Sequence, residues 1–248
     1  VIFDVNAQAK GHAYYSLGAF EISPDENLLA YSSDTSGFRE YTLQIKDLRS
    51  GSYLPERIEK VRSMAWAADS RTLFYVKEDK AKRASRVYRH LLGSQDDQLV
   101  YEETDVRFSV SVADSRSRRY LFITSHSATT SEVRTLRAED PWALPSLVCE
   151  RRAGHEYYLD HGNGLFYIAT NDRGRNFRLV SAPENKPGED HWKELIAHRD
   201  GVMLEGVDVF ARHVIVHERA GGFPRLRVLR LADGESHEVS MPEPACSV

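Results

Sequence analysis

The feature of this sequence that most constrains its fold is a short motif, a polar turn followed by an apolar run, which recurs along the chain. The motif reads PDENLLAY at 24–31, ADSRTLFY at 68–75, SRRYLFI at 117–123, HGNGLFYI at 161–168 and FARHVIV at 210–216. The last residues of the five apolar runs are 44, 48, 45 and 48 residues apart. A fixed period of this length is typical of repeat architectures, in which each repeat forms one structural unit.

The residues within one period predict four β-strands. In the first period the strands are expected at 16–22, 28–33, 40–47 and 53–58, with polar turns between them. Alternation is clear in the third of these strands, where Tyr41, Leu43 and Ile45 share one face. Third strands of the later periods are expected at 86–92, 131–137, 176–181 and 225–231. Helix signals are weak throughout.

Four short strands in about 45 residues are the content of one β-propeller blade. A β-sandwich would also contain such strands, but it gives no reason for the period, whereas propeller blades pack on similar neighbours. We therefore expect an all-β chain that is a β-propeller fragment of about five four-stranded antiparallel blades. The full blades are expected at approximately 16–58, 62–103, 107–151, 154–197 and 202–241.

Both ends of the sequence suggest a piece of a larger propeller. VIFDV at 1–5 is expected to form a strand before the first full blade, and PACSV at 244–248 resembles the opening of another. A propeller closes by joining its two ends, and no closure is apparent here. Because an incomplete ring exposes two apolar blade faces, we expect the fragment to self-associate rather than to tighten into a smaller ring.

Composition narrows the classes of partner. The net charge of −4, with acidic and basic residues interspersed, argues against nucleic acid or an anionic membrane as a partner. No apolar run approaches the roughly 18 residues that span a bilayer, and the first ten residues lack the features of a signal peptide. Two distant cysteines, Cys149 and Cys246, make a disulfide framework improbable, so a cytoplasmic location is expected.

Six stretches, taken together and in order, resemble the propeller of the oligopeptidase B (protease II) group within the prolyl oligopeptidase family of serine peptidases. They are DVNAQAKGHAYYSLG at 4–18, SHSATTSEVRTL at 125–136, GHEYYLDH at 154–161, NDRGRNFRLV at 171–180, WKELIAHRD at 192–200 and MLEGVDVF at 203–210. The resemblance covers essentially the whole chain.

The resemblance implies a seven-bladed parent propeller that caps an α/β-hydrolase domain. By this likeness one blade before the chain, most of one after it, and the catalytic domain lie outside the sequence. The implied role is non-catalytic: the propeller admits short peptides, cleaved after arginine or lysine, to the catalytic domain and excludes folded proteins. The implied partners are that catalytic domain and short basic peptides, and no cofactor is expected.

The residues themselves contain no serine nucleophile motif. An α/β-hydrolase carries its serine on a strained turn written G-x-S-x-G, and this pentapeptide does not occur in the sequence. The nearest pairs, Gly51-Ser52 and Gly93-Ser94, lack the second glycine and read as hairpin turns. We therefore expect no catalytic residue in this chain and no activity from it alone.

Two further patterns are better explained by strands and turns. His155-Glu156 with His161 places its histidines six residues apart, whereas the zinc metalloprotease motif needs four on a helix. A structural strand is therefore expected, and no metal site. Gly221-Gly222 lies between two strand candidates without a following helix or lysine, so a hairpin is expected rather than a phosphate loop.

One position is predicted to bind substrate. The resemblance extends to SDTSGFREYTL at 33–43, where relatives carry a loop arginine that handles substrate near the domain interface. Some relatives have two arginines there, whereas this chain has Phe38 and then Arg39. A guanidinium can hold a carboxylate through two hydrogen bonds. The alternative is that Arg39 is a solvated hairpin residue.

Two other classes of protein remain open from the residues alone. The first is a stand-alone propeller that acts as a protein-interaction scaffold, as WD40 and kelch proteins do. Such proteins repeat Trp-Asp or Gly-Gly signatures, and this chain has no Trp-Asp and one Gly-Gly. The second is an export-associated or sugar-binding propeller, which would more often carry an export signal.

Overall fold

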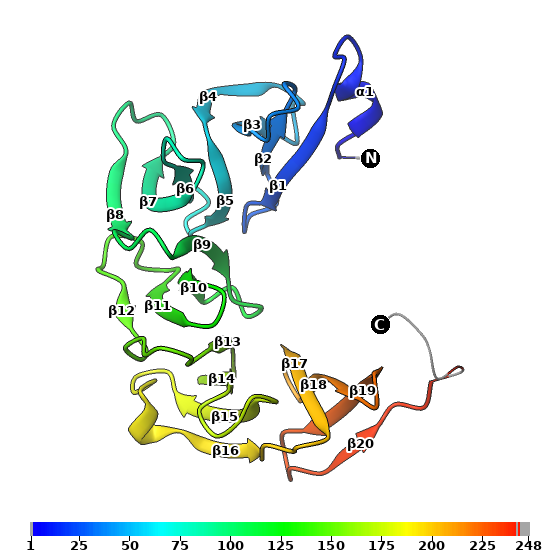
Figure 1. Ribbon diagram of the computed structural model, residues 1–248. Helices are drawn as coiled ribbons and strands as arrows, with labels where there is room; N and C mark the ends of the chain where they lie inside the picture. Colours follow the sequence, from blue (N-terminus) through cyan, green and yellow to red (C-terminus); the bar gives the residue numbers. More distant parts are fainter. Residues whose placement is uncertain (1, 242, 244–248) are drawn as a thin grey trace. The chain divides into compact units, whose positions relative to one another are not determined.

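The computed structural model of the chain describes residues 2–241 and residue 243. Within these residues the strands form five four-stranded sheets, and the order of strands in each sheet follows the sequence (Figure 1). The pairings given for each sheet are antiparallel. The predicted fold class, a fragment of a β-propeller, is confirmed.

The bounds of the strands are as follows. The first sheet contains β1 (Ser16–Ile22), β2 (Leu28–Asp34), β3 (Thr42–Asp47) and β4 (Tyr53–Glu59). The second contains β5 (Val61–Trp66), β6 (Thr72–Glu78), β7 (Ala84–Leu91) and β8 (Gln98–Glu102). The third contains β9 (Ser109–Asp114), β10 (Tyr120–His126), β11 (Ser131–Arg137) and β12 (Ser146–Leu147). The fourth contains β13 (Tyr157–Gly162), β14 (Leu165–Thr170), β15 (Arg178–Pro183) and β16 (Lys193–Ile196). The fifth contains β17 (Val202–Val209), β18 (His213–Ala220), β19 (Phe223–Arg230) and β20 (Ser236–Glu238).

The beginning of the chain differs from the prediction. Residues 2–4 form no strand, and a short helix, α1 (Val5–Ala9), follows them. The reason is Asp4, whose carboxylate accepts hydrogen bonds from the backbone amides of Asn6 and Ala7 and so caps the first turn of a helix. Over the described part of this range, residues 2–5, the strand expected at 1–5 is therefore wrong. The stretch 244–248 and Cys246 lie outside the described residues.

The chain divides into two compact units, each with apolar clusters of its own. The first unit comprises Val1–Asp114, Arg118–Ser127 and Arg134–Ser146, and the second comprises Ser115–Ser117, Ala128–Val133 and Leu147–Val248. In the first unit one cluster joins the first sheet to the second and another joins the second sheet to β9 and β10. In the second unit a cluster joins the fourth sheet to the fifth. Sheets that pack face to face in this way exclude water from both faces of their middle strands.

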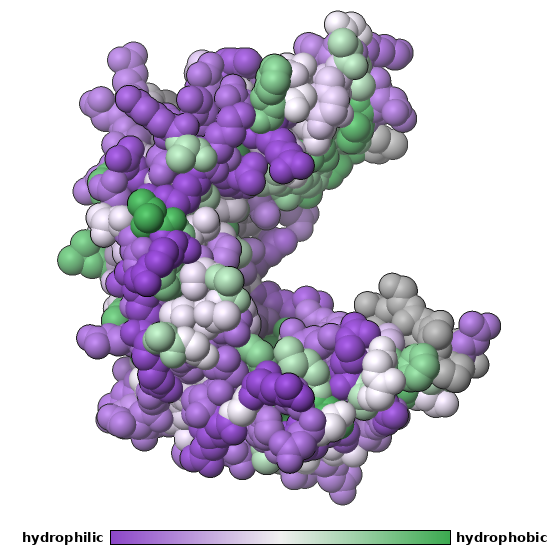
Figure 2. All heavy atoms as spheres, viewed as in Figure 1, coloured by the Kyte–Doolittle hydropathy of each residue, from purple (hydrophilic) through white to green (hydrophobic). Residues whose placement is uncertain are grey.

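Burial varies systematically from the middle to the edge of a sheet. The second strands β2, β6 and β14 are almost entirely buried. The fourth strands β8, β12 and β20 are largely exposed, and β4 alternates between exposed and partly buried residues. Hydrophilic residues cover most of the face shown in Figure 2. No helix among the described residues is long and apolar enough to cross a membrane.

A glycine lies at the contact between the fourth and fifth sheets. Gly162, the last residue of β13, is buried, and a Cβ atom built on it would lie 2.6 Å from Cγ1 of Val209. Non-bonded carbon atoms essentially never lie this close, so any larger residue at this position would force Val209 to shift.

Candidate functional site

The loop that carries Arg39 connects β2 to β3 and is organised by one buried carboxylate. Asp34 ends β2, and its side chain accepts hydrogen bonds from the amide of Ser36 at 2.8 Å, the hydroxyl of Ser36 at 2.6 Å and the amide of Arg39 at 2.8 Å. Burial raises the pKa of Asp34, but the hydrogen bonds from Ser36 and Arg39 outweigh burial and leave this pKa below its usual value. The loop is therefore held by an ionised group at neutral pH.

The tip of this loop presents an aromatic and a cationic side chain to solvent. Arg39 has a positive φ of 60° and is exposed, and Phe38 beside it is 71% exposed. A left-handed conformation is costly for arginine, and the bond from its amide to Asp34 offsets that cost. The structure thus places the predicted substrate-binding residue at an accessible position with a fixed backbone.

A second loop supports the first. Lys82 lies between β6 and β7, and its ammonium group donates to the carbonyl of Phe38 at 2.6 Å and pairs with Glu40 at 3.3 Å. Its own loop has the same construction, because Asp79 accepts from the amides of Ala81 and Arg83. The β2–β3 and β6–β7 connections therefore have the same construction, and the Lys82 ammonium group links them.

A polar cavity of about 460 Å³ lies beside the β2–β3 loop, within the first unit. Its lining includes Asp34, Ser36 and Glu40 from the loop, and Arg57 and Lys60 from the neighbourhood of β4. The lining does not include Arg39. The cavity therefore offers both signs of charge to a ligand, while Arg39 stands outside it.

The remaining motifs lie where turns were expected. Gly51-Ser52 lies between β3 and β4, Gly93-Ser94 between β7 and β8, and Gly221-Gly222 between β18 and β19. All four glycines have positive φ, which is the conformation that tight turns demand of glycine.

His155 and His161 make separate sets of contacts. His155 precedes β13 and its Nε2 lies 2.9 Å from the hydroxyl of Thr170. His161 lies within β13, with Nε2 3.0 Å from Glu184 and Nδ1 2.7 Å from Ser117. The contacts given for the two histidines are therefore to different residues, and both flank or lie in a strand rather than on a helix.

The structure does bring together a group of metal-binding type that the sequence pattern did not reveal. Cys149, His155 and Glu189 place one potential ligand atom each within 4.8 Å of the others. Glu189 is 40 residues from Cys149 in the sequence, and no local spacing links the two.

The sequence of the chain matches one family over its whole length, namely the prolyl oligopeptidase N-terminal β-propeller domain, at residues 1–248. Dipeptidyl aminopeptidase BI of Pseudoxanthomonas mexicana is 39% identical over 253 residues, which cover 100% of this chain and 35% of that protein. Protease 2 of Moraxella lacunata is 30% identical over 253 residues, covering 100% of this chain and 36% of the relative. The chain thus spans about a third of the length of these relatives.

Solved structures agree with this assignment. Oligopeptidase B from Leishmania major superimposes with a TM-score of 0.90 at 29% identity, covering 98% of this chain and 36% of that one. Oligopeptidase B from Trypanosoma brucei, in a closed form with covalently bound antipain, gives a TM-score of 0.88 at 28% identity, with the same coverage. By sequence and by fold, the chain belongs to the prolyl oligopeptidase family and represents its N-terminal β-propeller domain.

Proposed function

We propose that this chain is the non-catalytic domain of a serine oligopeptidase that cleaves short peptides after basic residues, and that it limits access to the catalytic domain by size. The observation that carries the proposal is the family match at residues 1–248, combined with relatives about three times as long. The name of oligopeptidase B supports short peptides as the substrate class, and the preference for basic residues is what the resemblance of the sequence implies. Walls and motion suffice for selection by size, and neither needs a catalytic group.

Arg39 is proposed to contact the substrate in the full-length protein. Its exposed side chain and its anchored backbone suit a group that must reach a peptide without reordering the loop. A guanidinium can bind a carboxylate through two parallel hydrogen bonds, so Arg39 could bind either the C-terminal carboxylate or an acidic side chain of a peptide.

Cleavage of a length series tests the gating role. The full-length protein would be given unstructured peptides that share one arginyl bond and differ only in length, with trypsin as the control for accessibility of that bond. With the full-length protein, we expect kcat/KM to fall to background for the longest peptides. With trypsin, we expect kcat/KM to be the same for every length. Equal cleavage of all lengths by both enzymes would overturn the size limit.

A second activity is favoured by the relative with 39% identity, whose name describes removal of dipeptides from an amino terminus. The two activities differ in their need for a free amine. An acetylated peptide with an internal arginine would be cut by the basic-residue oligopeptidase and refused by a dipeptidyl aminopeptidase. Cleavage of the free peptide alone, with release of its first two residues, would select the second activity.

The scaffold alternative receives no support from the relatives, which are peptidases by name.

We further propose a cytoplasmic location, for which the free thiol of Cys149 is the supporting observation. Fractionation of cells that express the tagged full-length protein would test it, and recovery outside the cytoplasm would contradict it.

A further inference from the structure

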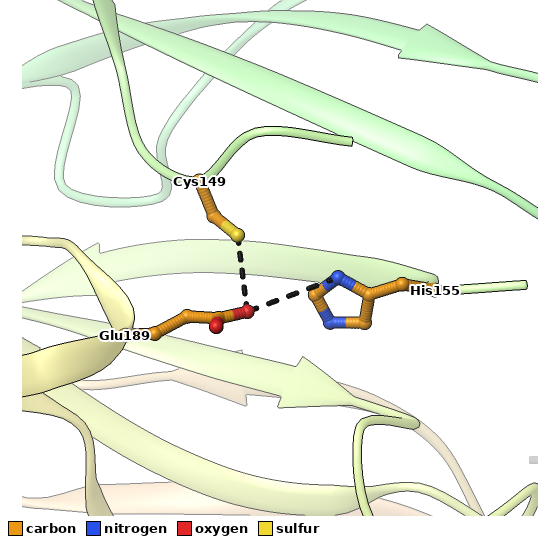
Figure 3. A group of neighbouring side chains, drawn as sticks. All are labelled: Cys149, His155 and Glu189. Atoms are coloured by element: carbon orange, nitrogen blue, oxygen red, sulfur yellow. Dashed lines mark hydrogen bonds and ion pairs between the residues drawn. The ribbon is translucent and has the colours of Figure 1, made fainter. Parts of the chain in front are cut away.

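Three side chains from separate segments converge beside the fourth sheet (Figure 3). Cys149 follows β12, His155 precedes β13, and Glu189 opens a short 3₁₀ helix, η1 (Glu189–His191). The Sγ atom of Cys149 lies 3.0 Å from Oε1 of Glu189, and Nδ1 of His155 lies 3.9 Å from the same oxygen. All three belong to the second compact unit. A sulfur, a nitrogen and an oxygen thus surround one small volume.

The histidine gives independent evidence that a cation belongs there. His155 is 3% exposed, and its Nδ1 is buried without a hydrogen-bond partner among the described residues. This atom faces the carboxylate of Glu189, as Figure 3 shows. A buried polar atom without a partner is costly. Coordination of a cation between the nitrogen and the carboxylate would remove that cost.

Contacts other than those with Cys149 and Glu189 also fix the orientation of the His155 ring. Its Nε2 lies 2.9 Å from the hydroxyl of Thr170, and the ring stacks on Tyr157 with centroids 5.3 Å apart. Trp192 packs against the same ring at 6.3 Å. A hydrogen bond on the second ring nitrogen is the usual support of a histidine that ligates a metal. The site therefore has an oriented ligand before any metal arrives.

We propose that Cys149, His155 and Glu189 form a zinc site, with Cys Sγ, His Nδ1 and Glu Oε1 as ligands and water in the fourth position. Thiolate, imidazole and carboxylate are the three ligand types that Zn²⁺ accepts, and three protein ligands plus water complete a tetrahedron. Glu189 has a side chain that is 36% exposed, so an ion can enter from solvent.

Two features weaken the binding of Zn²⁺ at this site. The Cys149 thiol donates to Oε1 of Glu189 at 3.0 Å, so Zn²⁺ must displace the proton that makes this hydrogen bond. Arg152 donates to Oε1 of Glu189 at 2.7 Å and competes with the ion for that oxygen. The Arg152 side chain is 49% exposed and can turn into solvent. We therefore expect a site of moderate affinity that strengthens when Arg152 is removed.

Cobalt provides the direct test. The full-length protein would be reduced, stripped with chelator, and titrated with Co²⁺, whose bond to a thiolate gives a charge-transfer band in the near ultraviolet. Zn²⁺ affinity would then be measured by competition with a chromophoric chelator. We expect one equivalent of Co²⁺ to produce the band and one equivalent of Zn²⁺ to abolish it.

Variants assign the ligands. Cys149→Ser should eliminate the band, and Glu189→Gln, a change at an exposed side chain, should weaken Zn²⁺ binding about 100-fold or more, because loss of a ligand exceeds the 10–100-fold effect of losing its support. Arg152→Ala should tighten binding several-fold. Glu150→Gln is the matched acidic control, and Cys246→Ser is the matched thiol control, and both should bind as the parent does.

The following outcomes would contradict the proposal, and each can be distinguished from misfolding and from non-specific metal binding. A folded Glu189→Gln variant, verified by circular dichroism, that binds Zn²⁺ as tightly as Glu150→Gln would overturn the site. Loss of the cobalt band in Cys246→Ser rather than in Cys149→Ser would do the same. Arg152→Ala with unchanged affinity would overturn the competition between Arg152 and the metal for Oε1 of Glu189.

Discussion

Glu21 is a partly buried carboxyl group whose ionisation falls within the neutral pH range. It lies in β1, and burial, followed by the negative charge of Asp114, raises its pKa to about 7, against the opposing effect of Arg118. The folded chain therefore binds a proton at Glu21 that the unfolded chain has already released above pH of about 4.5. The bound proton contributes fully to the free energy of unfolding below the unfolded pKa, and this contribution is lost as the pH rises through 7.

Glu21→Gln should consequently stabilise the protein at pH 8 and leave it unchanged at pH 4. Because Glu21 is only partly buried, solvent screening reduces the full linkage energy, and we expect a gain of about 1–2 kcal/mol at the higher pH. Urea unfolding at both pH values measures the difference. Glu150→Gln, at an exposed position, serves as the control. Equal effects of Glu21→Gln at the two pH values would contradict the linkage.

Arg39→Ala should affect substrate binding in the full-length protein more than the chemical step. A contact away from the scissile bond contributes to association, so KM or inhibition by excess substrate should change, with a loss of about 1–3 kcal/mol for a charged hydrogen bond. Steady-state kinetics over a wide range of substrate concentration provides the measurement. Arg175→Ala is the matched control, since Arg175 is an exposed arginine in the β14–β15 connection. Identical kinetics for both variants would make Arg39 a solvated loop residue.

At the scale of the element, Gly162→Ala should destabilise the contact between the fourth and fifth sheets. The new methyl group would collide with Val209, a branched side chain that is 4% exposed, and overpacking of this kind costs about 1–3 kcal/mol. Thermal unfolding of the variant measures the loss. Gly201→Ala, where a Cβ meets nothing within 4 Å, should be nearly neutral.

A second substitution distinguishes the collision from a backbone effect. Val209→Ala vacates the space that the new methyl group needs, so the double variant should lose less stability than the sum of the two single variants. Additive losses would mean that Gly162 is required for its backbone rather than for the approach of Val209.

Strand positions could be predicted because they depend on local chemistry. In the first sheet, all four strands begin and end within two residues of the expected positions. Alternation and turn residues act over a few positions, and both are visible in the sequence. The error at 1–5 has a local cause as well, since Asp4 is a strong N-cap inside an otherwise apolar stretch.

The site could be predicted only in part, because its geometry arises from long-range packing. The β2–β3 loop and Arg39 were located by resemblance, but the support from Lys82 requires the second sheet to lie beside the first. Cys149 and Glu189 are 40 residues apart in the sequence, and only the packing of the chain brings them together. Side-chain identity alone does not show that His155 turns its Nδ1 toward Glu189.

At the scale of the molecule, the chain alone should have no peptidase activity. It contains no G-x-S-x-G turn, and a serine peptidase needs a nucleophile, a base and an oxyanion hole in one place. Incubation of the purified chain with an arginyl fluorogenic peptide should release no more fluorophore than buffer does. Sustained turnover that a serine-directed inhibitor blocks would contradict this expectation.

The isolated chain is also predicted to self-associate. A propeller blade packs on two neighbours, so a partial set of blades leaves apolar surface that association would cover. Light scattering coupled to size exclusion should show a mass above that of the 28.2 kDa monomer. A monomer at every micromolar concentration would refute the prediction.

The exposed fourth strands have a further consequence for how the protein behaves when it is concentrated. A sheet edge with free amides and carbonyls is a template on which another chain can add a strand and begin a cross-β fibril. Here the edges are short or polar, as in β12 and β20, and β4 contains Pro55, which has no amide hydrogen to offer. Mutations that make these edges longer and more apolar, rather than mutations in the buried strands, are therefore the ones expected to promote cross-β aggregation.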